Sequence, residues 1–117
     1  LHDEDAARRL SAALDRMLGA IADPVRRRAI ELLGQKPRSA GELASMLGLA
    51  PPAMSRHLRA LKEGGLVEDG HPHFDARVRI YSLKRGATDE LKRWLAETEA
   101  RWAHQLAAFK AHVEGSE

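Results

Sequence analysis

The sequence lacks several features that would point to particular functions. It has no cysteine, which excludes a disulfide framework, a thiolate zinc site and a cysteine nucleophile. No apolar run approaches the ~20 residues of a membrane span, and the first residues have no signal-peptide character. The phosphate-binding loop, His-Glu-x-x-His and Gly-x-Ser-x-Gly motifs of common enzymes are also missing. We therefore expect a protein of the cytoplasm that has no enzymatic activity.

The length and composition are those of one small globular domain. The chain has 117 residues, of which 44% are apolar and 31% are charged. A monomer of this size buries only about two-thirds of its unfolded surface, so a partner subunit would add to its stability.

The chain has little excess of either charge, with a net charge of only +2, but its basic and acidic residues are unevenly distributed along the sequence. Residues 24–85 carry twelve Lys or Arg against six Asp or Glu, whereas residues 1–23 and 86–117 each carry two more acidic than basic residues. The basic middle predicts contact with a polyanion. Random variation along a short chain is the alternative explanation.

Hydrophobic periodicity and capping residues predict helices, then a hairpin, then a long helix. Asp23 and Pro24 are typical of a helix start, as is the Ser39 to Glu42 capping box. Gly34 and Gly48 favour helix ends. The expected elements are helices over residues 4–22, 24–33, 39–47 and 51–62, a β-hairpin over 66–83 and a last helix over 87–113.

This order predicts a mostly α-helical, winged helix-turn-helix fold with a small β-hairpin. We expect a single domain over residues 1–117, with the helix-turn-helix at 39–62 and the wing at 66–83. The terminal helices, 4–22 and 87–113, are expected to mediate dimerisation.

The fourth helix has a polar face that suits DNA. Met54, Leu58 and Leu61 recur at i, i+4 and i+7 and should face the core. The opposite side then presents a set of four residues: Pro52, Ser55, Arg56 and Arg59. Arginine can bind guanine with two hydrogen bonds, and serine can contact a base or a phosphate. The alternative is an ordinary solvated helix face.

The hairpin adds a second basic element. Arg77 and Arg79 alternate with Val78 and Ile80, so both arginines should point away from the packed face. An arginine on a wing can enter a minor groove or hold phosphates, although charged residues are also common on the outer face of a ribbon.

At this point the chain resembles the ArsR-type winged-helix transcriptional regulators, over roughly residues 8–113. The resemblance rests on residues 23–33, Glu42-Leu43-Ala44, the run from Met54-Ser55-Arg56-His57-Leu58 to Gly64-Gly65-Leu66-Val67, and Arg79-Ile80-Tyr81-Ser82-Leu83. It implies a homodimer that represses transcription from an inverted-repeat operator in double-stranded DNA and is released by an effector. It also places Ser55, Arg56 and His57 in the recognition helix and Arg79 in the wing. The complete set of expected DNA contacts is Ser39, Pro52, Ala53, Ser55, Arg56, His57, Arg59, Arg77 and Arg79.

The metal-binding patterns of such regulators are absent. Residues 41–46 hold no cysteine pair, and Glu97, Glu99, His104 and His112 lack the ligand spacing expected on the last helix. His71 and His73 supply two ligands where zinc needs three or four. We therefore expect no metal and no cofactor, and a subgroup without the usual ligands. A metal sensor with His and Glu ligands and a protein-interaction module remain as alternatives.

The terminal helices carry apolar stripes that one small domain cannot cover. We expect them in a dimer interface, with a small-molecule effector pocket between the helices as a further option. The expected interface residues are Leu10, Leu14, Met17, Leu91, Leu95, Trp102, Leu106 and Phe109.

Overall fold

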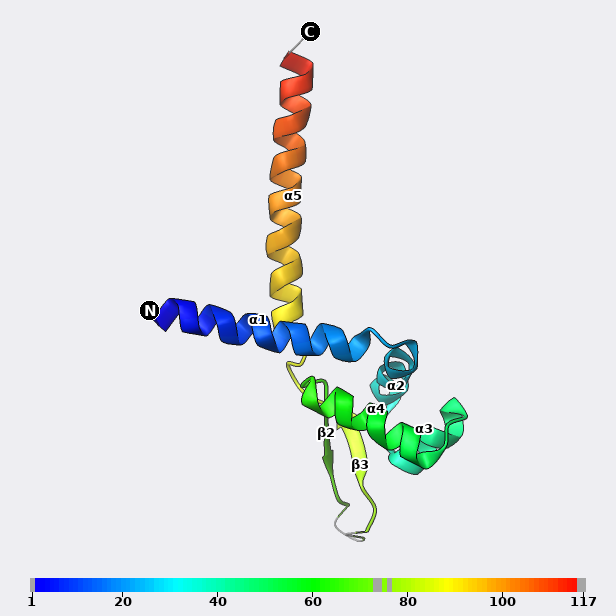
Figure 1. Ribbon diagram of the computed structural model, residues 1–117. Helices are drawn as coiled ribbons and strands as arrows, with labels where there is room; N and C mark the ends of the chain where they lie inside the picture. The colour runs from blue at the N-terminus through cyan, green and yellow to red at the C-terminus, as the bar shows by residue number, and fades with distance from the viewer. Residues whose placement is uncertain (1, 73–74, 76, 116–117) are drawn as a thin grey trace. The chain divides into compact units, whose positions relative to one another are not determined.

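The computed structural model describes residues 2–72, 75 and 77–115, and the chain forms two compact units, Leu1–Ala87 and Thr88–Glu117. Among the described residues, the first unit contains four helices and three strands, and the second contains one long helix (Figure 1). In chain order the elements are α1 (His2–Ile21), α2 (Pro24–Gln35), β1 (Arg38–Ser39), α3 (Ala40–Leu47), α4 (Pro51–Glu63), β2 (Val67–Gly70), β3 (Ile80–Leu83) and α5 (Asp89–Gly115).

This architecture confirms the predicted winged helix-turn-helix fold. The wing is the antiparallel pair of β2 and β3, in which Val67 pairs with Leu83 and Gly70 with Ile80. The sheet has one strand more than the sequence indicated. The two-residue strand β1 pairs with β3 in the order β1-β3-β2, which ties the segment before α3 to the wing.

Local capping explains where the helices of the first unit begin and end. The capping box at Ser39 and Glu42 is present, and Gly48 ends α3 in the left-handed conformation at φ 67°. Helix α2, however, continues through Gly34 to Gln35. Its end is set by Pro37, because the residue before a proline disfavours the helical conformation, and Lys36 is indeed fully extended.

The start of α4 has no side-chain cap, because Ala50 occupies the N-cap position. Pro51 and Pro52 have fixed backbone φ angles that suit a first helical turn. They also carry no N–H group, so fewer amide donors at this helix start need a partner.

The core of the first unit is built mainly by α3, α4 and the start of β2. Its largest fully buried side chains are Leu43, Met54, Leu58, Leu61 and Val67. Helix α1 contributes Met17, only 5% exposed, and Ala20. Met17 therefore packs inside its own unit, and its expected place in a dimer interface stays a prediction.

Helix α5 has no buried residue within its 27. Its large apolar side chains include Trp102 and Phe109, whose exposed fractions are 62% and 67%. Leu95 and Leu106 are also exposed, and Leu91 is half-buried. In α1, Leu10 is exposed and Leu14 is half-buried.

Candidate nucleic-acid interface

Helix α4 presents the polar face that its periodicity predicts. Met54, Leu58 and Leu61 are fully buried, which fixes the rotation of the helix. The other side exposes Pro52, Ser55, Arg56 and Arg59, and Ala53 is half-buried beside them. In the described part of the chain, neither Arg56 nor Arg59 has an ion-pair partner. Two unpaired guanidinium groups and a hydroxyl therefore lie on one exposed face.

His57 connects α4 to the start of α2. The Nε–H of Arg26 donates to His57 Nδ1 over 3.2 Å, and the imidazole is half-buried. The sequence left open whether His57 holds a neighbouring helix or contacts a phosphate. The first of these contacts is present, and the second stays a prediction.

Asp23 caps the helix on which Arg26 lies. Its Oδ1 accepts hydrogen bonds from the backbone N–H of Val25 at 2.8 Å and of Arg26 at 3.2 Å. Desolvation acts to raise the pKa of the Asp23 carboxyl, but these hydrogen bonds and the nearby guanidinium charge of Arg26 outweigh it. The pKa therefore lies below its usual value, and the cap remains ionised at neutral pH.

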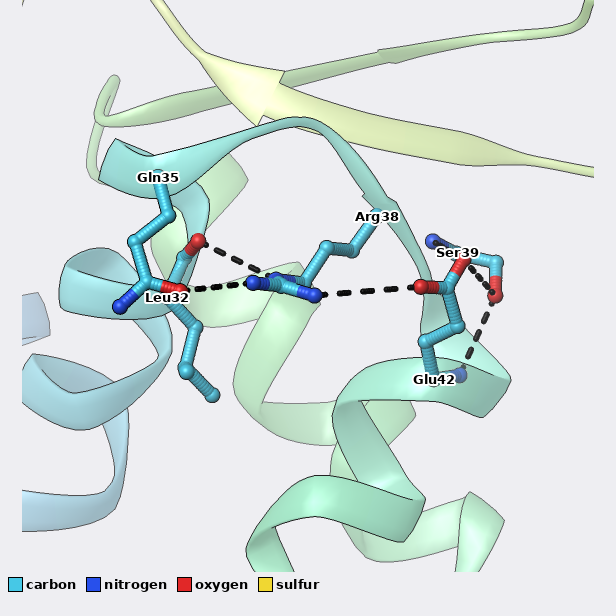
Figure 2. Close-up of polar contacts among 5 residues, drawn as sticks. All are labelled: Leu32, Gln35, Arg38, Ser39 and Glu42. Carbon is cyan, nitrogen blue, oxygen red and sulfur yellow. Dashed lines mark hydrogen bonds and ion pairs between the residues drawn. The ribbon is translucent and has the colours of Figure 1, made fainter.

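A buried arginine links the end of α2 to the start of α3, and the sequence analysis did not identify it. Arg38, 8% exposed, donates from Nε to the Leu32 carbonyl at 3.2 Å and from Nη2 to Gln35 Oε1 at 2.8 Å. Its Nη1 lies 4.0 Å from Glu42 Oε2, so the guanidinium lies between the end of α2 and the start of α3 (Figure 2). The only signal in the sequence was a basic residue one position before a capping box.

Ser39, an expected DNA contact, serves as the N-cap of α3. Its Oγ accepts a hydrogen bond from the Glu42 backbone N–H at 3.1 Å, and Glu42 Oε1 accepts from the Ser39 N–H at 3.3 Å (Figure 2). Its side chain is thus held by α3, and any contact with DNA remains a prediction.

In the wing, one carboxylate binds two cations. Asp69 Oδ1 lies 2.6 Å from Lys62 Nζ of α4, and Asp69 Oδ2 lies 3.1 Å from Arg79 Nε, just before β3. The hydrogen bond from Lys62 holds the pKa of the Asp69 carboxyl below its usual value, against the effect of desolvation. Arg79 therefore has an internal partner, although 54% of its side chain is exposed.

The tip of the wing holds Arg77, whose side chain is 92% exposed and whose Nε lies 3.3 Å from Asp75 Oδ1. Nearby, His71 Nδ1 and the Val78 carbonyl oxygen are 2.9 Å apart, a contact that closes the base of this loop. His73, considered above as a metal ligand, lies outside the described residues.

A groove of about 530 Å³ runs between α4 and the wing. Its lining includes Ser55, Arg59, Lys62 and Glu63 of α4, with Arg79 and Tyr81 from the wing. The groove therefore joins the two basic elements that the sequence singled out separately.

The described residues contain no group of three or more His, Cys, Asp or Glu placed to hold a metal ion. None of their helices combines the length and the apolar character needed to cross a membrane.

Comparison with known proteins agrees with this geometry. Residues 23–69 match the family described as bacterial regulatory protein, arsR family. The HTH-type transcriptional regulator Rv2034 of Mycobacterium tuberculosis is 46% identical over 100 residues, which cover 86% of this chain and 88% of that protein. The transcriptional repressor SdpR of Bacillus subtilis is 28% identical over 82 residues, or 70% of this chain and 88% of the repressor.

A solved structure with the same fold is the homodimeric winged helix-turn-helix DNA-binding domain Mb0332 of Mycobacterium bovis, determined by solution NMR. It aligns with a TM-score of 0.63 at 26% identity and covers 87% of this chain and 89% of that domain.

The family match and the similar regulators, together with the fold, identify a DNA-binding transcription regulator. The chain belongs to the ArsR family of bacterial regulatory proteins.

Proposed function

We propose that this regulator is a homodimeric repressor that binds an inverted-repeat operator through Ser55, Arg56 and Arg59 of α4. The observation that carries the proposal is the exposed, unpaired polar face of this helix beside a groove that leads to the wing. A helix of this kind fits the major groove, where arginine and serine read base edges. Since its target is genomic DNA, the protein is expected to act in the cytoplasm.

The wing is proposed to add contacts to the DNA backbone. Arg77 is almost fully exposed at its tip, and Arg79 lines the groove. Cations of this kind bind phosphates or enter a narrow minor groove, and they contribute affinity for many sequences alike. His57 of α4 and Ser39 at the N-cap of α3 remain candidate phosphate contacts.

Homodimerisation is supported by the apolar face of α5 and by the homodimeric relative from Mycobacterium bovis. At ~25 cal/mol per Å² of apolar surface, leaving the tryptophan, leucine and phenylalanine side chains of α5 in water costs several kcal/mol per subunit. This is comparable to the whole stability of a small domain. A two-fold dimer would also present two recognition helices to two half-sites.

Repression is supported by the likeness to a transcriptional repressor, and release by an effector is the step that such a repressor needs for regulation. The effector is proposed to be a small molecule rather than a metal ion, because the ligand spacing of metal-sensing relatives is missing. Restored DNA affinity after chelation, with loss of affinity on adding zinc or nickel, would contradict this part of the proposal.

The first experiment selects duplexes from a random-sequence pool with the wild-type protein. An enriched inverted repeat is expected, with two half-sites about one helical turn apart. Arg56→Ala should weaken binding to the selected duplex by about 1–3 kcal/mol while thermal unfolding stays unchanged, because the side chain is exposed.

Arg28→Ala is the matched control, because Arg28 is an exposed arginine on α2 and its replacement removes the same charge as Arg56→Ala does. Equal affinities for Arg56→Ala and wild type at one salt concentration would show that α4 is not the recognition helix. Enrichment of no sequence at all would leave a protein-interaction module as the explanation of the fold.

A further inference from the structure

The ion pairs at Asp69 join three elements of the first unit. Asp69 lies on β2, Lys62 on the last turn of α4, and Arg79 directly before β3. The carboxylate side chain is only 10% exposed, whereas the side chains of Lys62 and Arg79 are 55% and 54% exposed. The anion is thus sheltered beneath the two cations, which face the groove.

Both cations line the groove that also contains Ser55 and Arg59. The three charges of this cluster add up to one positive charge, so the groove presents less free cationic charge than its residue types indicate. Arg59, in contrast, has no ion-pair partner in the part of the chain that the structure describes.

We propose that Asp69 is a specificity-determining residue that positions Lys62 and Arg79 and limits their binding to DNA of arbitrary sequence. The proposal rests on the proposed DNA-binding function. Affinity for arbitrary DNA comes from cations that release counterions when they meet phosphates. A cation that already has a carboxylate partner gains less from a phosphate, because the phosphate must compete with that partner.

The same ion pairs favour the correct complex. A side chain that is already held in place loses less rotamer freedom when it binds a ligand in a fixed position. Phosphates of the correct operator, aligned by contacts of α4, meet the groove in one register. Arbitrary DNA meets it in many registers and depends on mobile cations. Asp69 therefore lowers the affinity for arbitrary DNA more than the affinity for the operator.

The test compares Asp69→Asn with Glu68→Gln. Both variants remove one negative charge from β2, but Glu68 is exposed and has no cationic partner among the described residues. Binding is measured by fluorescence anisotropy with two duplexes of about 30 base pairs, one of random sequence and one selected from a pool by the wild type. Salt is varied between about 50 and 200 mM.

Asp69→Asn should bind the random duplex about five- to tenfold more tightly at about 0.1 M salt, with a steeper dependence of log affinity on log salt. Binding to the selected duplex should change less, so the ratio of the two affinities falls. Glu68→Gln should change both affinities about equally and by about twofold or less. Asp69→Glu, which keeps the charge, should restore the wild-type salt dependence.

A second comparison leaves Asp69 unchanged and replaces the cations instead. Arg59→Gln removes an unpaired cation and should reduce the salt slope on the random duplex by about one. Lys62→Gln removes a paired cation and should reduce the salt slope on the random duplex clearly less than Arg59→Gln does.

Equal behaviour of Asp69→Asn and Glu68→Gln, or equal slopes for Arg59→Gln and Lys62→Gln, would overturn the inference. So would equal weakening of both duplexes together with a lower unfolding temperature, because Asp69 would then act only as a structural link. If the wild type binds the selected and the random duplex equally well, the proposed function fails as well. The wild-type comparison of the two duplexes therefore separates that failure from a failure of the inference about Asp69.

Discussion

At the scale of single residues, Gly64 is a position at which the first unit has no room for a side chain. A Cβ atom there would lie 2.7 Å from Ala20 Cβ and 3.2 Å from the Arg16 carbonyl oxygen, so α1 packs directly on the end of α4. Gly64→Ala should therefore lower the free energy of unfolding by about 1–3 kcal/mol, as overpacked cores do. Urea unfolding measures this change.

Gly70→Ala provides the matched control, because nothing lies within 4 Å of a Cβ at that position and its φ is not positive. It should unfold close to wild type. A stable Gly64→Ala protein would mean that α1 can move away from α4 at little cost.

The charge state of Asp69 makes stability depend on pH in the acid range. Its pKa is lowered in the folded protein by the hydrogen bond from Lys62 and by nearby charges. A lowered folded-state pKa stabilises the fold above the unfolded value near 4, and this stability is lost as the pH falls through the folded value. Wild-type stability should thus fall below about pH 4.

Asp69→Asn should show a shallower fall in unfolding free energy over this acid range, measured by urea unfolding at several pH values. Glu68→Gln should keep the wild-type slope, because the Glu68 carboxylate is exposed and has no cationic partner among the described residues. Identical slopes in the three proteins would assign the acid sensitivity to other carboxyls such as Asp23.

At this scale the sequence predicts which residues are buried or exposed where that depends on the period of a single helix. The exposed and buried faces of α4 follow from its period alone. The partners of Arg38 and Arg79 do not, because each depends on how separate elements approach one another. The connection between β2 and β3 is long, so the sequence does not determine the strand register that brings Arg79 to Asp69.

At the scale of elements, α3 provides a test that separates capping from DNA contact. Ser39→Ala should destabilise the protein by about 1 kcal/mol, because the Glu42 N–H loses its acceptor. Ser39→Asp keeps an acceptor at the N-cap and should unfold close to wild type.

The aspartate variant adds a negative charge, so it should weaken DNA binding if Ser39 lies near a phosphate. Anisotropy on the selected duplex measures this loss. Wild-type affinity in Ser39→Asp would restrict Ser39 to its capping role.

The elements that sequence predicted best were those whose limits are set locally. Caps at Asp23 and Ser39 and the left-handed Gly48 act within a few residues, so α2 and α3 begin as expected and α3 also ends as expected. Strand β1 has only two residues and exists through pairing with β3, about forty positions later along the chain. No periodic pattern can indicate a strand of that length.

At the scale of the whole molecule, the decisive prediction concerns the apolar face of α5. Trp102→Glu places a charge in the middle of this face, and burying it in a dimer would be costly. Sedimentation velocity should show a monomer, or a loss of folded protein, whereas the wild type is expected to sediment as a dimer.

Ala100→Glu is the matched control, since position 100 lies on the opposite side of α5 by the period of 3.6 residues. It should sediment as the wild type does. A dimeric Trp102→Glu protein would place the interface elsewhere, and a monomeric wild type would remove the dimer from the proposal.

The exposed tryptophans of α5 have an optical consequence. Trp94 and Trp102 are the two tryptophans of the chain, and both lie on this helix, whereas residues 1–87 contain a single tyrosine and no tryptophan. Emission excited at the red edge of absorbance therefore reports on α5 alone. If a second copy covers these indoles, dilution should shift the emission to longer wavelength before the far-ultraviolet circular dichroism of the whole chain reports unfolding. Assembly and folding can then be followed separately in one unlabelled sample.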